Sequence, residues 1–130
     1  MIAALASWHE QHVAAAAALE SVTALPAHAL IEVYSVLTRL PSGLAVTASV
    51  AAAALERRFP EPPLQFEDRG RLIGLLARAG VFGGASYDGL VALEAAGNDR
   101  MLLTLDDRAQ QTYLRLAVPF RALATDRDDL

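Results

Sequence analysis

The sequence alternates between segments with helical periodicity and short segments suited to β-strands, and this alternation restricts the fold more than any other feature. Helices are predicted over Ala3–Leu19, Ala29–Leu40, Thr47–Arg58, Asp68–Ala79, Ser86–Ala96 and Asp107–Leu116. Strands are predicted over Thr23–His28, Leu64–Phe66, Arg100–Leu105 and Val118–Leu123. Such alternation favours right-handed crossovers. The expected architecture is therefore a three-layer α/β/α fold with a central parallel sheet.

The segment Arg100–Leu105 is the most continuous apolar strand candidate, of the kind that is buried in parallel sheets. Asp106 stands at its carboxyl end. Open α/β sheets bind their ligands at that edge. Asp106 is therefore the first candidate for a functional residue.

Composition limits what the chain can be. With 130 residues, of which 54% are hydrophobic, residues 1–130 suit one domain with one core. The absence of cysteine excludes disulfides and thiolate metal sites. No apolar run approaches the roughly 20 residues that a bilayer requires, and no basic leader precedes one. We therefore expect a cytoplasmic protein without a membrane segment.

The chain is acidic, with a formal net charge of −4 at pH 7. This argues against a protein that coats nucleic acid through a general positive field. All eleven basic residues are arginine, which suits forked contacts to phosphate. Codon bias in a GC-rich genome accounts for this choice more simply, so arginine usage carries little weight as evidence of function.

Three acidic residues occupy positions where a solvated surface charge is not the simplest explanation. Glu32 lies in an apolar segment near a predicted helix start, Asp88 lies in a predicted first helical turn, and Asp106 ends a buried strand. Each alone is explained by the stabilisation of a carboxylate at a helix N-terminus. Together they converge on one crevice of a parallel sheet. Their shared location favours a common role.

Gathered carboxylates repel one another unless a cation neutralises them. Mg²⁺ or Mn²⁺ prefers oxygen ligands and is commonly held by one or two carboxylates together with a substrate phosphate. Such an ion stabilises charge on a phosphate that is being cleaved. The pattern therefore points to hydrolysis of phosphodiester bonds.

Three segments, Pro26–Pro41, Tyr87–Ala92 and Leu102–Ala109, contain these acidic residues. They resemble PIN-domain proteins, most closely VapC-like toxins of toxin–antitoxin pairs. The resemblance implies a PIN-like fold and an Mg²⁺-dependent endoribonuclease whose metal-binding and catalytic carboxylates are Glu32, Asp88 and Asp106. It also makes Thr104, the polar residue two before the last Asp, a candidate for substrate binding, and Asp107 a further candidate metal ligand.

The sequence departs from this family at its start. Family members open with a hydrophobic strand that ends in an additional Asp, whereas residues 1–5 here already belong to the helix that should follow it. The first central strand is therefore expected to be missing. Either the chain begins upstream of Met1, or it is a truncated relative. The truncated form leads to the alternative function, a PIN remnant that binds antitoxin or RNA without cleaving.

Two arginines and the apolar faces of the first helices indicate contacts to substrate and to a partner. Arg39 and Arg108 follow the acidic positions and are candidates for contacts to RNA phosphates. The apolar faces of the first helices, with Trp8, Leu19 and Leu37, exceed what one small core buries. They indicate a partner or a dimer, and the resemblance implies a cognate antitoxin.

Histidines are assigned to no catalytic site. His9 and His12 have the spacing of a metal pair but lack a third ligand. His28 is expected to cap or pack at the start of the Glu32 helix rather than to act as a general base. Trp8 and Tyr113 are expected in the core or at an interface, and stacking on RNA bases is the minor alternative.

Overall fold

The computed structural model describes residues 12–41 and 43–123, and the chain divides into two compact units, residues 1–63 and 64–130. The organisation of the chain as one domain stays a prediction. The predicted helix over residues 3–11 and the missing first strand lie outside the described residues.

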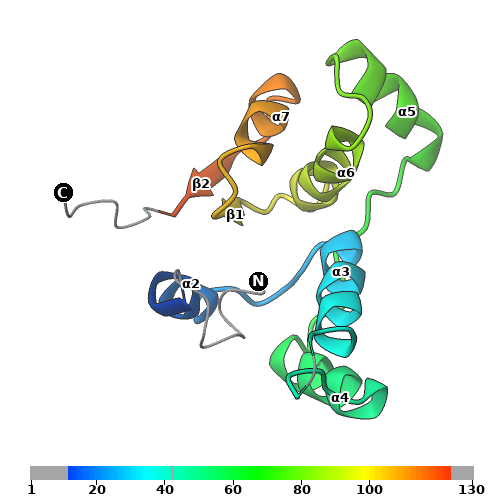
Figure 1. The fold of residues 1–130 in the computed structure, drawn as a ribbon. Coiled ribbons are helices and arrows are strands. Elements are labelled where there is room, and N and C mark those ends of the chain that lie inside the picture. The colour runs from blue at the N-terminus through cyan, green and yellow to red at the C-terminus, as the bar shows by residue number, and fades with distance from the viewer. Residues whose placement is uncertain (1–11, 42, 124–130) are drawn as a thin grey trace. The chain divides into compact units, whose positions relative to one another are not determined.

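The first unit contains the helices α2 (His12–Leu19), α3 (Ala27–Thr38) and α4 (Ala48–Arg58) (Figure 1). Its core consists of the buried side chains of Leu25, Val33, Leu55 and Phe59. Leu37 is half-buried against this core. Thr47 caps α4, as predicted, because its hydroxyl accepts a hydrogen bond from the Val50 N–H at 3.3 Å.

Arg58 joins two parts of the first unit. Its Nη1 donates to the carbonyl of Val22 at 3.1 Å, and its Nη2 donates to the carbonyl of Leu19. The guanidinium also lies 4.7 Å from the centre of the Phe59 ring. Arg58 thereby links the end of α4 to the last residue of α2 and to the chain that follows it.

The predicted strand Thr23–His28 is wrong. Pro26 forms only an isolated bridge, and α3 begins directly after it at Ala27. The φ of Pro26 is −54°, and its carbonyl accepts from the Leu30 N–H at 3.0 Å. Proline is suited to this place because its fixed φ starts a helix and its missing N–H is not needed there.

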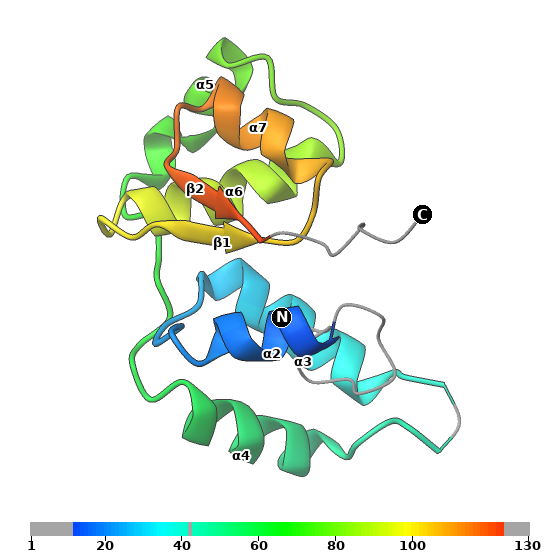
Figure 2. The same ribbon diagram turned by 90° about the vertical axis from the view of Figure 1, so that its left-hand side faces the viewer.

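The second unit contains three helices and two strands: α5 (Arg69–Arg78), α6 (Ala85–Ala96), β1 (Leu102–Thr104), α7 (Ala109–Arg115) and β2 (Phe120–Ala122). The strands pair in parallel, with Leu102 opposite Phe120 and Thr104 opposite Ala122. Since α7 joins them, they form a β–α–β crossover (Figure 2). The fold is thus mixed α/β with a parallel sheet, as expected.

The core of the second unit forms around α6, which packs against α5, α7 and β1. Its buried members include Ala92, Leu102 and Tyr113. The centre of the Tyr113 ring lies 5.4 Å from the centre of the Phe120 ring on β2. The prediction of Tyr113 as a core residue is confirmed.

Local predictions in this unit fail at two helix starts and one strand. The predicted strand Leu64–Phe66 is reduced to an isolated bridge at Leu64, because the two prolines before it offer no N–H donors. The α6 helix begins at Ala85 after Gly84, so Ser86 is not its cap. Asp68 precedes α5 but caps no N–H there; its carboxylate pairs with Arg71 at 3.6 Å.

Gly89 permits the close approach of α5 to α6, next to Asp88. A Cβ at this position would lie 2.5 Å from Cδ2 of the buried Leu76 and 3.3 Å from Cγ1 of Val81. We expect Gly89→Ala to lower the free energy of unfolding by about 1–3 kcal/mol, because overpacking outweighs the better helix propensity of alanine. Chemical denaturation of the purified variant measures this.

Gly74→Ala on α5 is the matched control. Its Cβ would meet only the Arg78 side chain, at 3.5 Å, which is ordinary contact. This variant is expected to be stabilised by roughly 0.5–1 kcal/mol. Equal effects of the two substitutions would contradict the packing argument.

Candidate functional site

Asp106 begins the turn between β1 and α7, and its carboxylate is held by backbone groups. Oδ1 accepts from the N–H of Arg108 at 2.9 Å and from the N–H of Ala109 at 3.3 Å. The backbone N–H of Asp106 in turn donates to Oγ1 of Thr104 at 3.0 Å. Both of these hydrogen bonds end on Oδ1, and Oδ2 takes part in neither.

Asp88 is half-buried in the first turn of α6, as predicted. The start of that helix carries N–H groups without intrahelical partners, which stabilise a carboxylate. The neighbouring Gly89 is buried against α5. Packing therefore fixes the first turn of α6 and the backbone of Asp88 with it.

Asp88 and Asp106 belong to the same end of the second unit. Only residues 97–101 separate α6 from β1, and the strand runs back along the helix (Figure 2). The start of α6 and the carboxyl end of β1 therefore face the same way. This is the edge at which parallel sheets bind ligands.

Glu32 belongs to the first unit. It lies in the second turn of α3 and not in the first, where no acidic residue stands. The expected placement at a helix N-terminus is therefore corrected. Its side chain is 58% exposed and pairs with His28, Nε2 to Oε1, at 2.8 Å. His28 thus contacts a predicted site residue, a contact that the spacing of four residues along a helix signals.

Other predicted site residues lie close to the turn after β1 or at the end of α3. Asp107 accepts from Nε2 of Gln110 at 3.2 Å, and Arg108 is exposed just before α7. Thr104 is buried, and its hydroxyl is used by the turn. Arg39 is exposed directly after α3. The contacts of these residues to metal or substrate stay predictions.

Carboxylate oxygens fit a hard divalent cation by their chemistry. Within residues 12–41 and 43–123, however, no group of three or more histidine or acidic side chains lies close enough together to hold a metal ion. The structure thus places Asp88 and Asp106 at one end of the second unit and Glu32 in the first unit. The gathering of all three stays a prediction.

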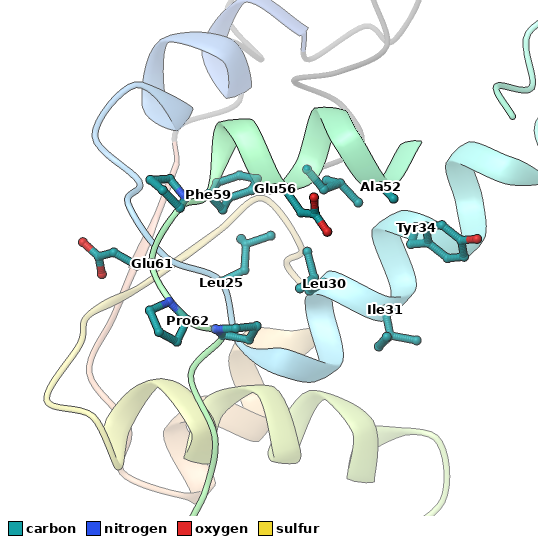
Figure 3. A pocket seen from close by; sticks show the side chains of 12 residues that line it. Leu25, Leu30, Ile31, Tyr34, Ala52, Glu56, Phe59, Glu61 and Pro62 are labelled. Carbon is teal, nitrogen blue, oxygen red and sulfur yellow. The ribbon is translucent and has the colours of Figure 1, made fainter. Parts of the chain in front are cut away.

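The first unit also contains a pocket of ≈ 480 Å³ between α3, α4 and the proline-rich segment 60–63 (Figure 3). Leu25, Leu30 and Phe59 contribute to an apolar wall. Glu56 projects from α4 toward Leu30, and Glu61 also belongs to the lining. The pocket therefore combines apolar surface with acidic groups.

Comparison with known proteins decides the family. The chain is 43% identical to Ribonuclease VapC40 of Mycobacterium tuberculosis over 121 residues, which cover 91% of this chain and 90% of that relative. It is 46% identical to Ribonuclease VapC27 of the same species over 96 residues, 73% of this chain and 70% of the relative. The chain belongs to the VapC-like family of PIN-domain proteins.

Membership in the VapC-like family confirms the resemblance predicted from the three sequence segments. No family model and no solved structure matches the chain. In the part of this VapC-like chain that the structure describes, no helix has the length and hydropathy to cross a bilayer. The predicted homodimer stays a prediction.

Two substitutions of Asp106 distinguish the contribution of its hydrogen bonds to stability from the contribution of its charge. Asp106→Ala removes the acceptor for two N–H groups, and we expect the free energy of unfolding to fall by about 0.5–2 kcal/mol. Asp106→Asn keeps an acceptor and is expected to stay within about 0.5 kcal/mol of the parent, since Asn and Asp are comparable caps. Denaturant unfolding compares them; equal losses in both variants would contradict the stabilising role of these two hydrogen bonds.

Proposed function

We propose that this chain is the toxin of a toxin–antitoxin pair and an endoribonuclease that cleaves RNA phosphodiester bonds with Mg²⁺ or Mn²⁺. The observation that carries the proposal is its 43% identity to a protein named Ribonuclease VapC40 across 91% of the chain. The structure supports the proposal through Asp88 and Asp106, which belong to the same end of the second unit.

In this proposal Glu32, Asp88 and Asp106 are the residues that would hold the cation. The cation supplies a Lewis acid that stabilises charge on the phosphate during cleavage. Asp106 presents one carboxylate oxygen while the other is fixed by two N–H groups. Asp107 is an additional candidate ligand. The chain thus provides preorganised acidic ligands on its own elements.

Substrate contacts are proposed for residues beside the carboxylates. Arg108, exposed before α7, and Arg39, exposed after α3, are suited to forked hydrogen bonds with RNA phosphates. Thr104 keeps the turn of Asp106 in place through its hydroxyl. We propose that Thr104 contributes to substrate binding by holding this turn in place.

The fold that brings these residues to one crevice is proposed to be the three-layer α/β/α arrangement of PIN domains. The pairing of β1 with β2 through α7 supports it, because it supplies one parallel crossover of that type. In this arrangement residues of both units form a single domain, and Glu32 joins Asp88 and Asp106.

RNA cleavage by the purified chain tests the site. With Mg²⁺ or Mn²⁺ we expect cleavage, and with a chelator none. Glu32→Gln, Asp88→Asn and Asp106→Asn are each expected to reduce the rate by about 100-fold or more, because each removes a charge that balances the cation. Gel analysis of a labelled RNA under single-turnover conditions measures the rate.

Asp99→Asn is the matched control for these substitutions. Asp99 is exposed, and its φ of 55° is a conformation that asparagine tolerates well. The control is expected to cleave at the parental rate. Parental activity in Asp88→Asn would contradict the metal site, while RNA or antitoxin binding without any cleavage by the parent would establish the binding-module alternative.

We further propose that the pocket of the first unit receives an apolar segment of the antitoxin that carries a basic residue. The apolar wall suits the segment, and Glu56, which projects toward Leu30, supplies the complementary charge. Ile31 lines the same pocket and is 65% exposed, as expected of a contact residue. The occupant is thus defined by both hydrophobicity and charge.

Titration with the antitoxin encoded beside this chain tests the pocket. Ile31→Glu is expected to weaken binding by about 30-fold, since truncated or charged interface anchors typically lose ~2 kcal/mol. Val50→Glu is the control, because Val50 is 55% exposed in the same unit but does not line the pocket. Equal weakening by both, or by neither, would place the antitoxin elsewhere.

A further inference from the structure

Glu32 differs from the other two candidate ligands in how its carboxylate can be held. Only the first four N–H groups of an α-helix lack intrahelical partners. Glu32 lies in the second turn of α3, beyond those groups. Its long and exposed side chain therefore needs a donor from another side chain if it is to keep one orientation.

His28 supplies such a donor. It lies one turn before Glu32 on the same helix, and its Nε2 is 2.8 Å from Oε1. The two side chains are 24% and 58% exposed. At this distance the Nε2–H donates to Oε1, while Oε2 stays available. The arrangement resembles that of Asp106, where one oxygen is held by donors and the other is left.

We infer that His28 is a positioning residue for metal binding, which holds the Glu32 carboxylate in the orientation that accepts the cation. The inference rests on the proposed metal site and adds a residue to it. Partners that hydrogen-bond to metal ligands typically account for 10–100-fold in metal affinity or activity. A histidine at position 28 thus has a role that a merely solvated residue would lack.

Calorimetric titration with Mn²⁺ tests the inference without reference to activity. His28→Ala is expected to weaken Mn²⁺ binding by about 10-fold to 100-fold. His28→Gln is expected to restore affinity to within about threefold of the parent, because its amide N–H₂ takes the place of Nε2–H. His28→Asn is the matched control, since its shorter amide corresponds to Nδ1 and is expected to bind as weakly as the alanine variant.

The Glu32→Gln variant separates this inference from the proposed function. If the metal site is correct, Glu32→Gln weakens Mn²⁺ binding, and adding His28→Ala to it has little further effect. Weakening by Glu32→Gln with none by His28→Ala overturns the role of His28 alone. No change in Mn²⁺ binding with Glu32→Gln overturns the metal site and the inference together.

Thermal unfolding and nitrogen NMR distinguish positioning from a structural role. A structural role alone would shift the unfolding midpoint of His28→Ala and leave Mn²⁺ affinity unchanged, which would overturn the inference. In the metal-free protein, the neutral His28 ring is expected to carry its proton on Nε2. A neutral ring that carries its proton on Nδ1 alone would equally contradict the hydrogen bond to Glu32, because Nε2 would then have no proton to donate.

Discussion

The parallel pairing of β1 with β2 is the constraint on which the second unit depends. Two parallel strands need a crossover, and α7 provides it with only a few residues on either side. The turn after β1 must therefore reverse quickly at the carboxyl edge of the sheet. Thr104 and Asp106 make this turn possible by supplying a hydroxyl and a carboxylate to its N–H groups.

The same polar groups thus serve the fold and the proposed chemistry. One carboxylate oxygen of Asp106 satisfies the backbone, and one is left for a ligand. Asp88 is placed by the packing of α6, and Glu32 by a side chain one turn away. Three carboxylates are therefore held by three different means. Their orientations depend on a turn, on a tightly packed helix start and on a hydrogen bond between side chains.

Much of the fold could be predicted because its signals are local. The apolar run at Leu102–Thr104, the cap at Thr47 and the first-turn position of Asp88 each follow from adjacent residues. The prediction of a strand at Thr23–His28 failed because it rested on the apolar composition of the segment. Pro26 favours the start of a helix, and α3 begins directly after it. The proposed gathering of the three carboxylates would depend on contacts between distant segments, which no local pattern encodes. Family membership supplied that part of the interpretation.

Arg58 gives a different meaning to the lysine-free composition of the chain. Its planar fork reaches two carbonyl groups at once, and its face lies over an aromatic ring. A lysine carries one compact ammonium and offers neither the flat face nor the divergent pair of donors. At position 58 the choice of arginine therefore matters for the fold. A lysine there would lose one of the two carbonyl contacts and the stacking on Phe59, and with them a link between the end of α4 and the end of α2.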